Sequence, residues 1–406
     1  MNDTPPIRTV TPPARPGPLV LALAALAALA PLSMHIFLPA LPVIAVDFAV
    51  DSGTAQLVLS VALFTIALAN LVYGPLSDRY GRRSVMFGGL LVFLVGSGIA
   101  ALAPDIHVLI GGRVLQGVGA SAGMVVGRAV LRDLYDRETA ARLMAYTVTA
   151  LVVAPMVAPL IGGLLLDFSG WRTIFIFSGG LAVLVLLVAM PRVPETLVER
   201  LPGTGARGLL GAFWSLLRVP AFRGYVGLCS FGMGMFMAFI GAAPYVTIDV
   251  LGRPPTEFGL YFMLVSLGFM GGTLTTARLT ARVGLERMLI VGSALGVFFG
   301  LVLIGMVAAG IWTTWSFFLP GAGMAFANGL VMPNAQSAAI SVNPRLAGSA
   351  SGITGFVQMG TGALFAQAAG SLQDGTPWPM AVLMLVASAL ALLSILVLPR
   401  LGRGPR

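Results

Sequence analysis

The chain has 406 residues, of which 57% are hydrophobic and only 10% are charged, and its mean hydropathy is +0.95. A soluble protein of this length needs far more charge to cover its surface, so the composition excludes that class. All 24 basic residues are arginines, and the lack of lysine excludes a Walker A phosphate loop. The single cysteine, Cys229, provides neither a disulfide framework nor a cysteine metal site, and we expect no metal or cofactor.

Apolar runs of about 20 residues, the length that crosses a bilayer as a helix, recur twelve times along the chain. Residues 1–17 precede them and are rich in proline, which predicts a disordered cytoplasmic tail. Arg8 and Arg15 before the first apolar run imitate a signal peptide, but cleavage would leave eleven spans. The predicted spans cover roughly 18–46, 54–76, 84–103, 106–129, 140–166, 172–191, 220–248, 256–281, 288–309, 311–341, 346–371 and 377–399.

The loops between the spans alternate in charge. Loops that follow odd-numbered spans hold Asp47, Asp51, Asp105, Asp167, Asp249, Glu257 and Asp374. Loops that follow even-numbered spans, together with both ends of the chain, hold most of the arginines, including Arg345. Arginine-rich loops stay on the cytoplasmic side of a membrane. We therefore expect a protein of the bacterial inner membrane with both termini on its cytoplasmic side. This dispersal also argues against a nucleic-acid partner, despite the net charge of +9.

A basic hairpin occurs twice, about half a chain apart. The first copy runs from Gly74 to Arg83, and a degraded second copy runs from Leu279 to Arg287 with a shift of about 203 residues. Such duplication predicts two similar halves that rock about a central site. We therefore expect an all-α fold of twelve transmembrane helices in two pseudo-symmetric six-helix bundles. The expected bundles are 18–191 and 220–400, with a cytoplasmic linker at 192–219 and a tail at 401–406.

This architecture resembles the major facilitator superfamily over essentially the whole chain. The first hairpin matches that family's signature at Gly74, Asp78, Arg79, Gly81, Arg82 and Arg83. The resemblance implies a conformational latch, in which Asp78 faces the N-terminal end of a neighbouring helix and Arg82 pairs with a carboxylate such as Asp133. We assign Arg128 to the same group. The alternative is that these arginines only fix the topology.

Local motifs resemble the bicyclomycin-resistance (Bcr/CflA-type) branch of drug:proton antiporters. They include Phe37-Leu38-Pro39-Ala40 at the end of the first span and Arg128-Ala129-x-x-Arg132-Asp133 at the end of the fourth. The fifth span carries the residues that correspond to the antiporter motif, namely Pro155, Pro159, Gly162 and Gly163. The alternative for this motif is helix packing and bending without any bearing on direction.

Few ionisable residues lie inside the predicted spans, and such residues are usually functional. They are His35 and Arg113, and His35 stands about where the branch usually has an aspartate. We expect His35 and Arg113 to carry proton coupling, with Asp249 as a weaker candidate. The alternatives are a neutral, hydrogen-bonded His35 and a coupling site elsewhere.

The resemblance implies a substrate cavity lined by the first, fourth, seventh and tenth spans. Flexible methionine and flat phenylalanine suit a pocket that accepts several apolar shapes. The alternative for these residues is ordinary contact with lipid or with neighbouring helices. The candidates are Met233, Met235, Phe236, Phe239, Asn328, Asn334 and Gln358.

The expected function is proton-coupled efflux of small amphipathic drugs by a monomer embedded in the lipid bilayer. A proton-coupled uptake symporter for a nutrient could share the fold. Gly119-Ala120-Ser121-Ala122-Gly123 fits the pattern of serine hydrolases, so an intramembrane hydrolase using Ser121 and His35 is a remote alternative. A sensor that binds without transporting is another.

Overall fold

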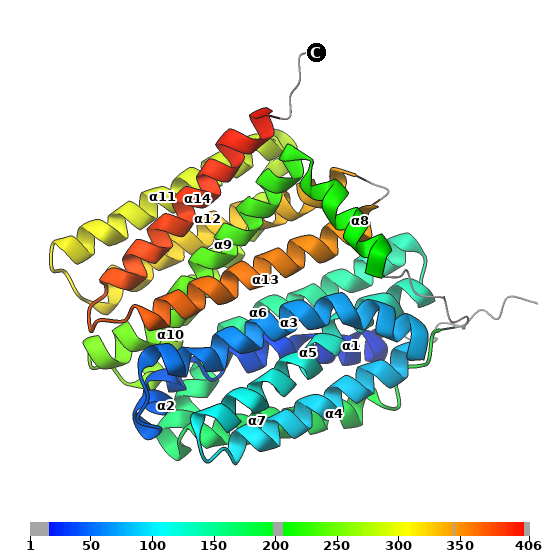
Figure 1. The fold of residues 1–406 in the computed structure, drawn as a ribbon, viewed down its shortest axis with the longest axis horizontal. Helices are drawn as coiled ribbons and strands as arrows, with labels where there is room; N and C mark the ends of the chain where they lie inside the picture. Colours follow the sequence, from blue (N-terminus) through cyan, green and yellow to red (C-terminus); the bar gives the residue numbers. More distant parts are fainter. Residues whose placement is uncertain (1–15, 198–205, 344–345, 402–406) are drawn as a thin grey trace, which may run out of the picture.

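The computed structural model describes residues 16–197, 206–343 and 346–401, and these form a bundle of long helices (Figure 1). Within this part of the chain, twelve helices of 19 to 33 residues each coincide with one predicted span. They are α1 (Pro16–His35), α3 (Ser52–Tyr80), α4 (Arg82–Ala101), α5 (Ile106–Leu134), α6 (Arg137–Ser169), α7 (Trp171–Ala189), α9 (Pro220–Tyr245), α10 (Pro255–Val283), α11 (Leu285–Ala308), α12 (Thr314–Ser341), α13 (Ala347–Ser371) and α14 (Trp378–Leu401).

Nine helices of the described chain combine the length and the hydropathy needed to cross a bilayer. The helices α12 and α13 are long enough but carry more small and polar residues. Within α6, Val153–Ser169 forms an apolar stretch. The first predicted span is interrupted: α1 ends at His35, a 3-10 turn η1 covers Leu38–Ala40, and α2 covers Leu41–Asp47. Pro39 and Pro42 lack the backbone N–H that would continue a regular helix.

The predicted linker contains a helix that the sequence analysis did not expect, α8 (Ala206–Leu217). Residues 1–15 of the predicted N-terminal tail, 198–205 of the linker, Arg345 and residues 402–406 lie outside the described residues. The last two residues of the predicted N-terminal tail are helical and belong to α1.

The two six-helix halves repeat one packing plan. In the N-terminal half α4 packs on α5, α3 on α5 and α1 on α6; in the C-terminal half α11 packs on α12, α10 on α12 and α9 on α13. The two basic hairpins turn at Gly81 and Gly284, which have φ of +100° and +91°. Only glycine adopts this conformation without strain, so both copies of the repeat keep it. Figure 1 shows the first half in blue to green and the second in green to red.

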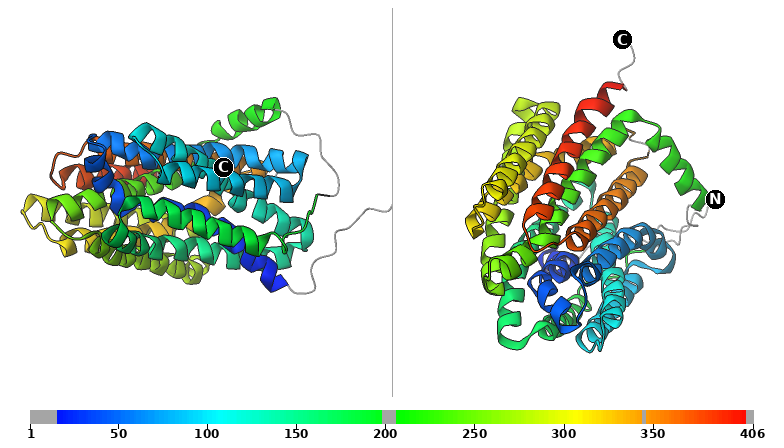
Figure 2. Two further views of the ribbon diagram at one scale, coloured as in Figure 1. Left: turned by 90° about the horizontal axis from the view of Figure 1, so that it is seen from below. Right: turned by 60° about the vertical axis from the view of Figure 1, so that its left-hand side comes forward.

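One side of the bundle carries the start of α1, the end of α14 and both basic hairpins, and we call it the termini side (Figure 2). On the opposite, far side, α3 and α13 are joined by hydrogen bonds between the halves. Ser52 Oγ donates to the Gly370 carbonyl oxygen over 2.9 Å, and Ser60 Oγ donates to Gln367 Oε1 over 2.6 Å. Gln367 Nε2 in turn donates to the Gly53 carbonyl oxygen over 2.8 Å.

Close packing of α6 completes the far-side contact. A Cβ added to Gly163 would lie 2.6 Å from the Pro255 carbonyl oxygen of the other half. Within the N-terminal half, one added to Gly162 would lie 1.6 Å from the Ile36 carbonyl oxygen. The Thr256 hydroxyl also donates to Asp167 across the halves. Among the described residues, every hydrogen bond between the halves lies on the far side. The halves are therefore closed there by polar contacts between them, and the described residues form no such hydrogen bonds on the termini side.

We predict that Gly162→Ala destabilises the protein by about 1–3 kcal/mol, because the new methyl group overlaps the backbone of residue 36. The measurement is the melting temperature of the purified protein in detergent. Gly98→Ala on α4 is the control, since no heavy atom lies within 4 Å of its added Cβ. Equal melting temperatures for the two variants would contradict the close approach.

Candidate functional site

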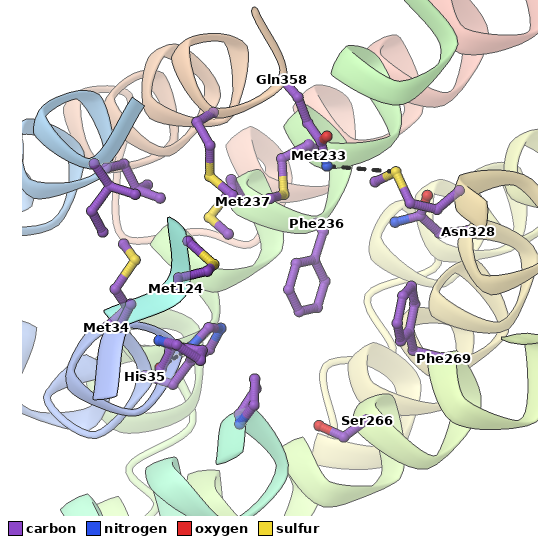
Figure 3. Close-up of a pocket in the computed structure, with 17 residues that line it drawn as sticks. Met34, His35, Met124, Met233, Phe236, Met237, Ser266, Phe269, Asn328 and Gln358 are labelled. Atoms are coloured by element: carbon purple, nitrogen blue, oxygen red, sulfur yellow. Dashed lines mark hydrogen bonds between the residues drawn. The ribbon is translucent and has the colours of Figure 1, made fainter. Parts of the chain in front are cut away.

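A cavity of about 290 Å³ lies between the two halves (Figure 3). Its walls come mainly from α1, α9, α10, α12 and α13, and they are largely apolar. Six methionines and two phenylalanines line it, and only a few polar side chains reach it. The lining includes Met34, Met124, Met233, Met237, Met332, Met359, Phe236 and Phe269, with His35, Ser266, Asn328 and Gln358 as the polar groups.

The structure places some of the predicted cavity residues in this lining and others elsewhere. Met233, Phe236, Asn328 and Gln358 line the cavity, and Pro155 of the α6 motif reaches it as well. The other three predicted residues do not. Met235 is buried away from it, Phe239 packs against Phe262 and Phe318, and Asn334 is bonded to Thr280 and to its own helix.

His35 has one ring nitrogen bonded and one free. Its Nδ1 lies 2.6 Å from the Pro31 carbonyl oxygen, and since a carbonyl only accepts, Nδ1 carries a hydrogen. Nε2 is buried without a hydrogen-bond partner among the described residues. The ring lies among aromatic side chains, with centroids 6.4 Å from Phe236 and 6.1 Å from Phe262. His35 thus lines the cavity with a protonatable nitrogen that has no polar partner among the described residues.

Arg113 is held behind the cavity wall rather than in it. Its side chain is fully buried, and it donates to Gln116 Oε1 over 2.8 Å and to the carbonyl oxygens of Ser33 and Val58 over 3.2 Å each. Its guanidinium lies 4.1 Å from the ring centroid of Phe37. Carbonyl dipoles and the ring face stabilise the charge in place of a carboxylate. No hydrogen bond joins Arg113 to His35 in this state. The predicted pair is linked only indirectly, because Arg113 donates to the carbonyl oxygen of Ser33, two residues before His35 on α1.

Two other sequence candidates lie apart from His35. Asp249 is exposed at the far side, where the short helix η2 (Val246–Val250) borders a separate cavity of about 410 Å³. Ser121 is fully buried within α5, and its hydroxyl donates to the Gly117 carbonyl oxygen of its own helix over 2.9 Å. The serine–histidine pair that a hydrolase needs is not formed. The hydrolase alternative therefore lacks its nucleophile.

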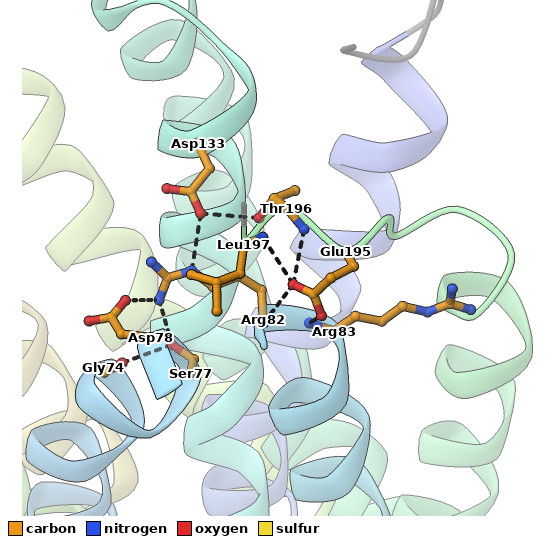
Figure 4. Close-up of polar contacts among 9 residues, drawn as sticks. All are labelled: Gly74, Ser77, Asp78, Arg82, Arg83, Asp133, Glu195, Thr196 and Leu197. Carbon is orange, nitrogen blue, oxygen red and sulfur yellow. Dashed lines mark hydrogen bonds and ion pairs between the residues drawn. The ribbon is translucent and has the colours of Figure 1, made fainter. Parts of the chain in front are cut away.

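The basic hairpin forms a charge cluster at the termini side of the N-terminal half (Figure 4). Arg82 is buried and bridges two carboxylates, with Nη1 2.5 Å from Asp78 Oδ1 and Nε 3.0 Å from Asp133 Oδ2. Its Nη1 also donates to Ser77 Oγ over 2.6 Å. The expected pair of Arg82 with Asp133 is confirmed. Arg79 is exposed and lies over the ring of Tyr80.

Glu195 is part of this cluster and was not among the residues predicted from the sequence. Its two carboxylate oxygens accept from the backbone N–H groups of Arg82 and Arg83 over 2.8 and 3.1 Å. A carboxylate at this place stabilises the positive N-terminal end of α4. We expected Asp78 in that role, but Asp78 pairs with the side chain of Arg82 instead. The one signal in the sequence that could have indicated this role is that Glu195 is an acidic residue in an arginine-rich loop.

Arg128 was assigned to the latch and does not belong to it. It is exposed, one turn beyond Met124 on α5, and lines a second cavity between the halves. Asp133, five residues further on, is occupied by Arg82 and by the hydroxyl of Thr196.

Comparison with known proteins agrees with this architecture. Residues 23–366 match the Major Facilitator Superfamily. The chain is 30% identical to multidrug resistance protein D of Escherichia coli (strain K12), covering 88% of this chain and 90% of that protein. It is 27% identical to a bicyclomycin resistance protein homolog of Haemophilus influenzae, covering 89% and 91%. A crystal structure of a D-xylose–proton symporter superposes with a TM-score of 0.73 at 15% identity, covering 92% of this chain and 96% of that one.

The all-helical duplicated fold, the signature hairpin and these relatives converge on one assignment. The chain is a multi-pass membrane transporter, not an enzyme, and it belongs to the major facilitator superfamily, in its bicyclomycin-resistance (Bcr/CflA-type) branch.

Proposed function

We propose that this transporter exports small amphipathic drugs across the bacterial inner membrane in exchange for protons, as a monomer. The observation that carries the proposal is the apolar cavity between the halves with one protonatable side chain, His35, in its wall. The positive-inside bias of the loops assigns the termini side to the cytoplasm. The described state then accepts substrate from the cell interior and is closed to the outside.

The free nitrogen of His35 supplies a physical basis for exchange. A protonated imidazole needs water or a polar partner, and the surrounding methionine and phenylalanine side chains provide neither. Water in an open, empty cavity can solvate that charge. An apolar drug displaces this water and therefore disfavours protonation of His35. Drug and proton thus compete for one cavity without binding the same atom.

The charge cluster around Arg82 suits the role of a conformational latch. In the described state it is satisfied within the N-terminal half, through Asp78, Asp133 and Glu195. Closure on the termini side would bring the α3–α4 hairpin against the other half, where a freed Asp78 carboxylate can meet a helix N-terminus. The latch would then exchange partners between the two states.

Uptake by symport is the second candidate, because the D-xylose–proton symporter shares the fold. Export is favoured by the names of the relatives and by the α6 motif. Through Gly163, that motif packs against α10 of the other half and helps to close the far side. Neither the drug-resistance relatives nor the α6 motif is expected of a nutrient importer.

The test of export is a panel of antibiotics on cells that overproduce the protein, with and without a protonophore. We expect raised resistance to some amphipathic compounds and lower cellular accumulation of them, both lost when the proton gradient is collapsed. Increased accumulation of a panel compound on overproduction would instead support uptake.

Replacing His35 with Ala should abolish export driven by a pH gradient while leaving drug binding measurable, because the apolar walls remain. The measurement is gradient-driven transport in proteoliposomes beside equilibrium binding. His107→Ala is the matched control, since His107 is the only other histidine and is exposed at the start of α5. Gradient-driven export that persists unchanged in His35→Ala would make His35 structural.

Replacing Asp78 with Asn should reduce transport by about tenfold or more with little loss of protein. The fold retains the Arg82–Asp133 pair, but the exchangeable carboxylate is gone. Transport and membrane abundance are measured together, with Arg287→Gln as a control for the loss of a charge from the exposed second hairpin. Wild-type transport in Asp78→Asn rules out the latch.

A further inference from the structure

A second cavity of about 430 Å³ continues the central one toward the termini side, and we call it the vestibule. It lies between α3 and α5 of the first half and α12 and α13 of the second. Met124, Gln358 and Met359 line both cavities, so the two cavities adjoin at these side chains. A molecule that fills both would extend from the methionine-lined interior to a more polar mouth.

Arg128 is the single charged side chain among the described residues of the vestibule. It is exposed to the cavity and makes no hydrogen bond or ion pair with any residue in the described ranges. The other polar groups of the vestibule are uncharged, including Asn70, Gln336 and Thr354. The guanidinium, with its fork of N–H donors, is therefore available to a ligand.

No carboxylate lines the vestibule or the central cavity in the described parts of the chain. The nearest acid along α5, Asp133, is held by Arg82 and Thr196. A cationic drug would be repelled by Arg128 as it entered, and no carboxylate in either cavity would stabilise its charge. An anionic head group would gain a charge-assisted, two-pronged hydrogen bond.

We propose that the cavity pair selects amphipathic organic acids, whose carboxylate binds Arg128 while the apolar body enters the central cavity. This inference rests on the proposed transport function and names its substrate class. The arrangement predicts discrimination between an acid and its neutral amide of nearly identical shape. It also predicts that permanently cationic drugs are poor ligands.

The test uses the purified full chain in phosphatidylcholine nanodiscs and isothermal titration calorimetry. The probes are naphthaleneacetate and naphthaleneacetamide, which share the apolar body and differ in charge. We expect the acid to bind about tenfold more tightly than the amide, as charge-assisted hydrogen bonds are about twice as strong as neutral ones. Arg128→Gln should remove that difference and leave amide affinity unchanged. Arg128→Lys should retain part of it, because a point charge lacks the planar fork.

Arg287→Gln is the control, since it removes an exposed arginine that lies outside both cavities, just after the α10–α11 hairpin. It should keep the wild-type preference. Equal wild-type affinities, absence of acid binding, or a preference that survives in Arg128→Gln would each overturn the proposal. Size-exclusion elution of each variant confirms that the protein is folded.

A membrane lipid could supply the same anionic chemistry, so a second set of nanodiscs also contains phosphatidylglycerol. Unchanged affinity for the acid supports a soluble substrate, whereas loss of its binding assigns Arg128 to a lipid head group and overturns the proposal. The failures of the two proposals are distinguishable. Drug export without acid preference defeats only the substrate class, and acid preference without any export defeats only the proposed function.

Discussion

The contact between the halves at the far side is the constraint on which the described state depends. It combines the backbone approach of Gly163 to Pro255 with the hydrogen bonds of Gln367 and Ser52. Each such hydrogen bond contributes about 0.5–1.5 kcal/mol, so the whole contact is worth a few kcal/mol. That is the range in which two conformations of a transporter can interconvert. A stronger seal would trap the protein with one side permanently open.

Scarcity of charge inside the bilayer gives each buried ionisable group a distinct environment. Arg113 is almost fully satisfied by carbonyl oxygens, Gln116 and an aromatic ring, so it stays charged without facing the cavity. His35 lines the cavity with one ring nitrogen bonded and the other without a polar partner among the described residues. The first arrangement is suited to fixing the end of α1 beside α3 and α5. The second is suited to gaining and losing a proton.

The helices, their order and the two hairpin turns could be predicted, because each depends on local patterns. Apolar length sets a span, and a glycine such as Gly81 or Gly284 marks a turn with positive φ. The cavity lining could be predicted only in part. A transmembrane helix is apolar on every side, so sequence does not tell which face Met233 or Met235 presents. For the same reason, the sequence did not indicate five further methionines of the lining, namely Met34, Met124, Met237, Met332 and Met359.

Contacts between segments distant in sequence were the other limit. Glu195 lies 113 residues from Arg82, and nothing local connects the linker with the start of α4. The placement of Arg128 is a related case. Its neighbours along the chain suggested the latch, whereas in the fold it faces a cavity that α5 shares with α12 and α13. Transmembrane spans can be predicted from the order of apolar residues along the chain. The partners of charged residues depend on how the helices are rotated and packed, which that order does not contain.

The separation of His35 from Arg128 has a consequence for coupling. An anion beside His35 would stabilise the imidazolium, and drug and proton would then bind together rather than compete. With the carboxylate held at Arg128, the methionines of α5 and α13 lie between the head group and the histidine, and only the apolar body reaches Phe236. Desolvation then dominates at His35 while charge pairing dominates in the vestibule. The same cavity can therefore bind an acid and still release a proton, which exchange in opposite directions requires.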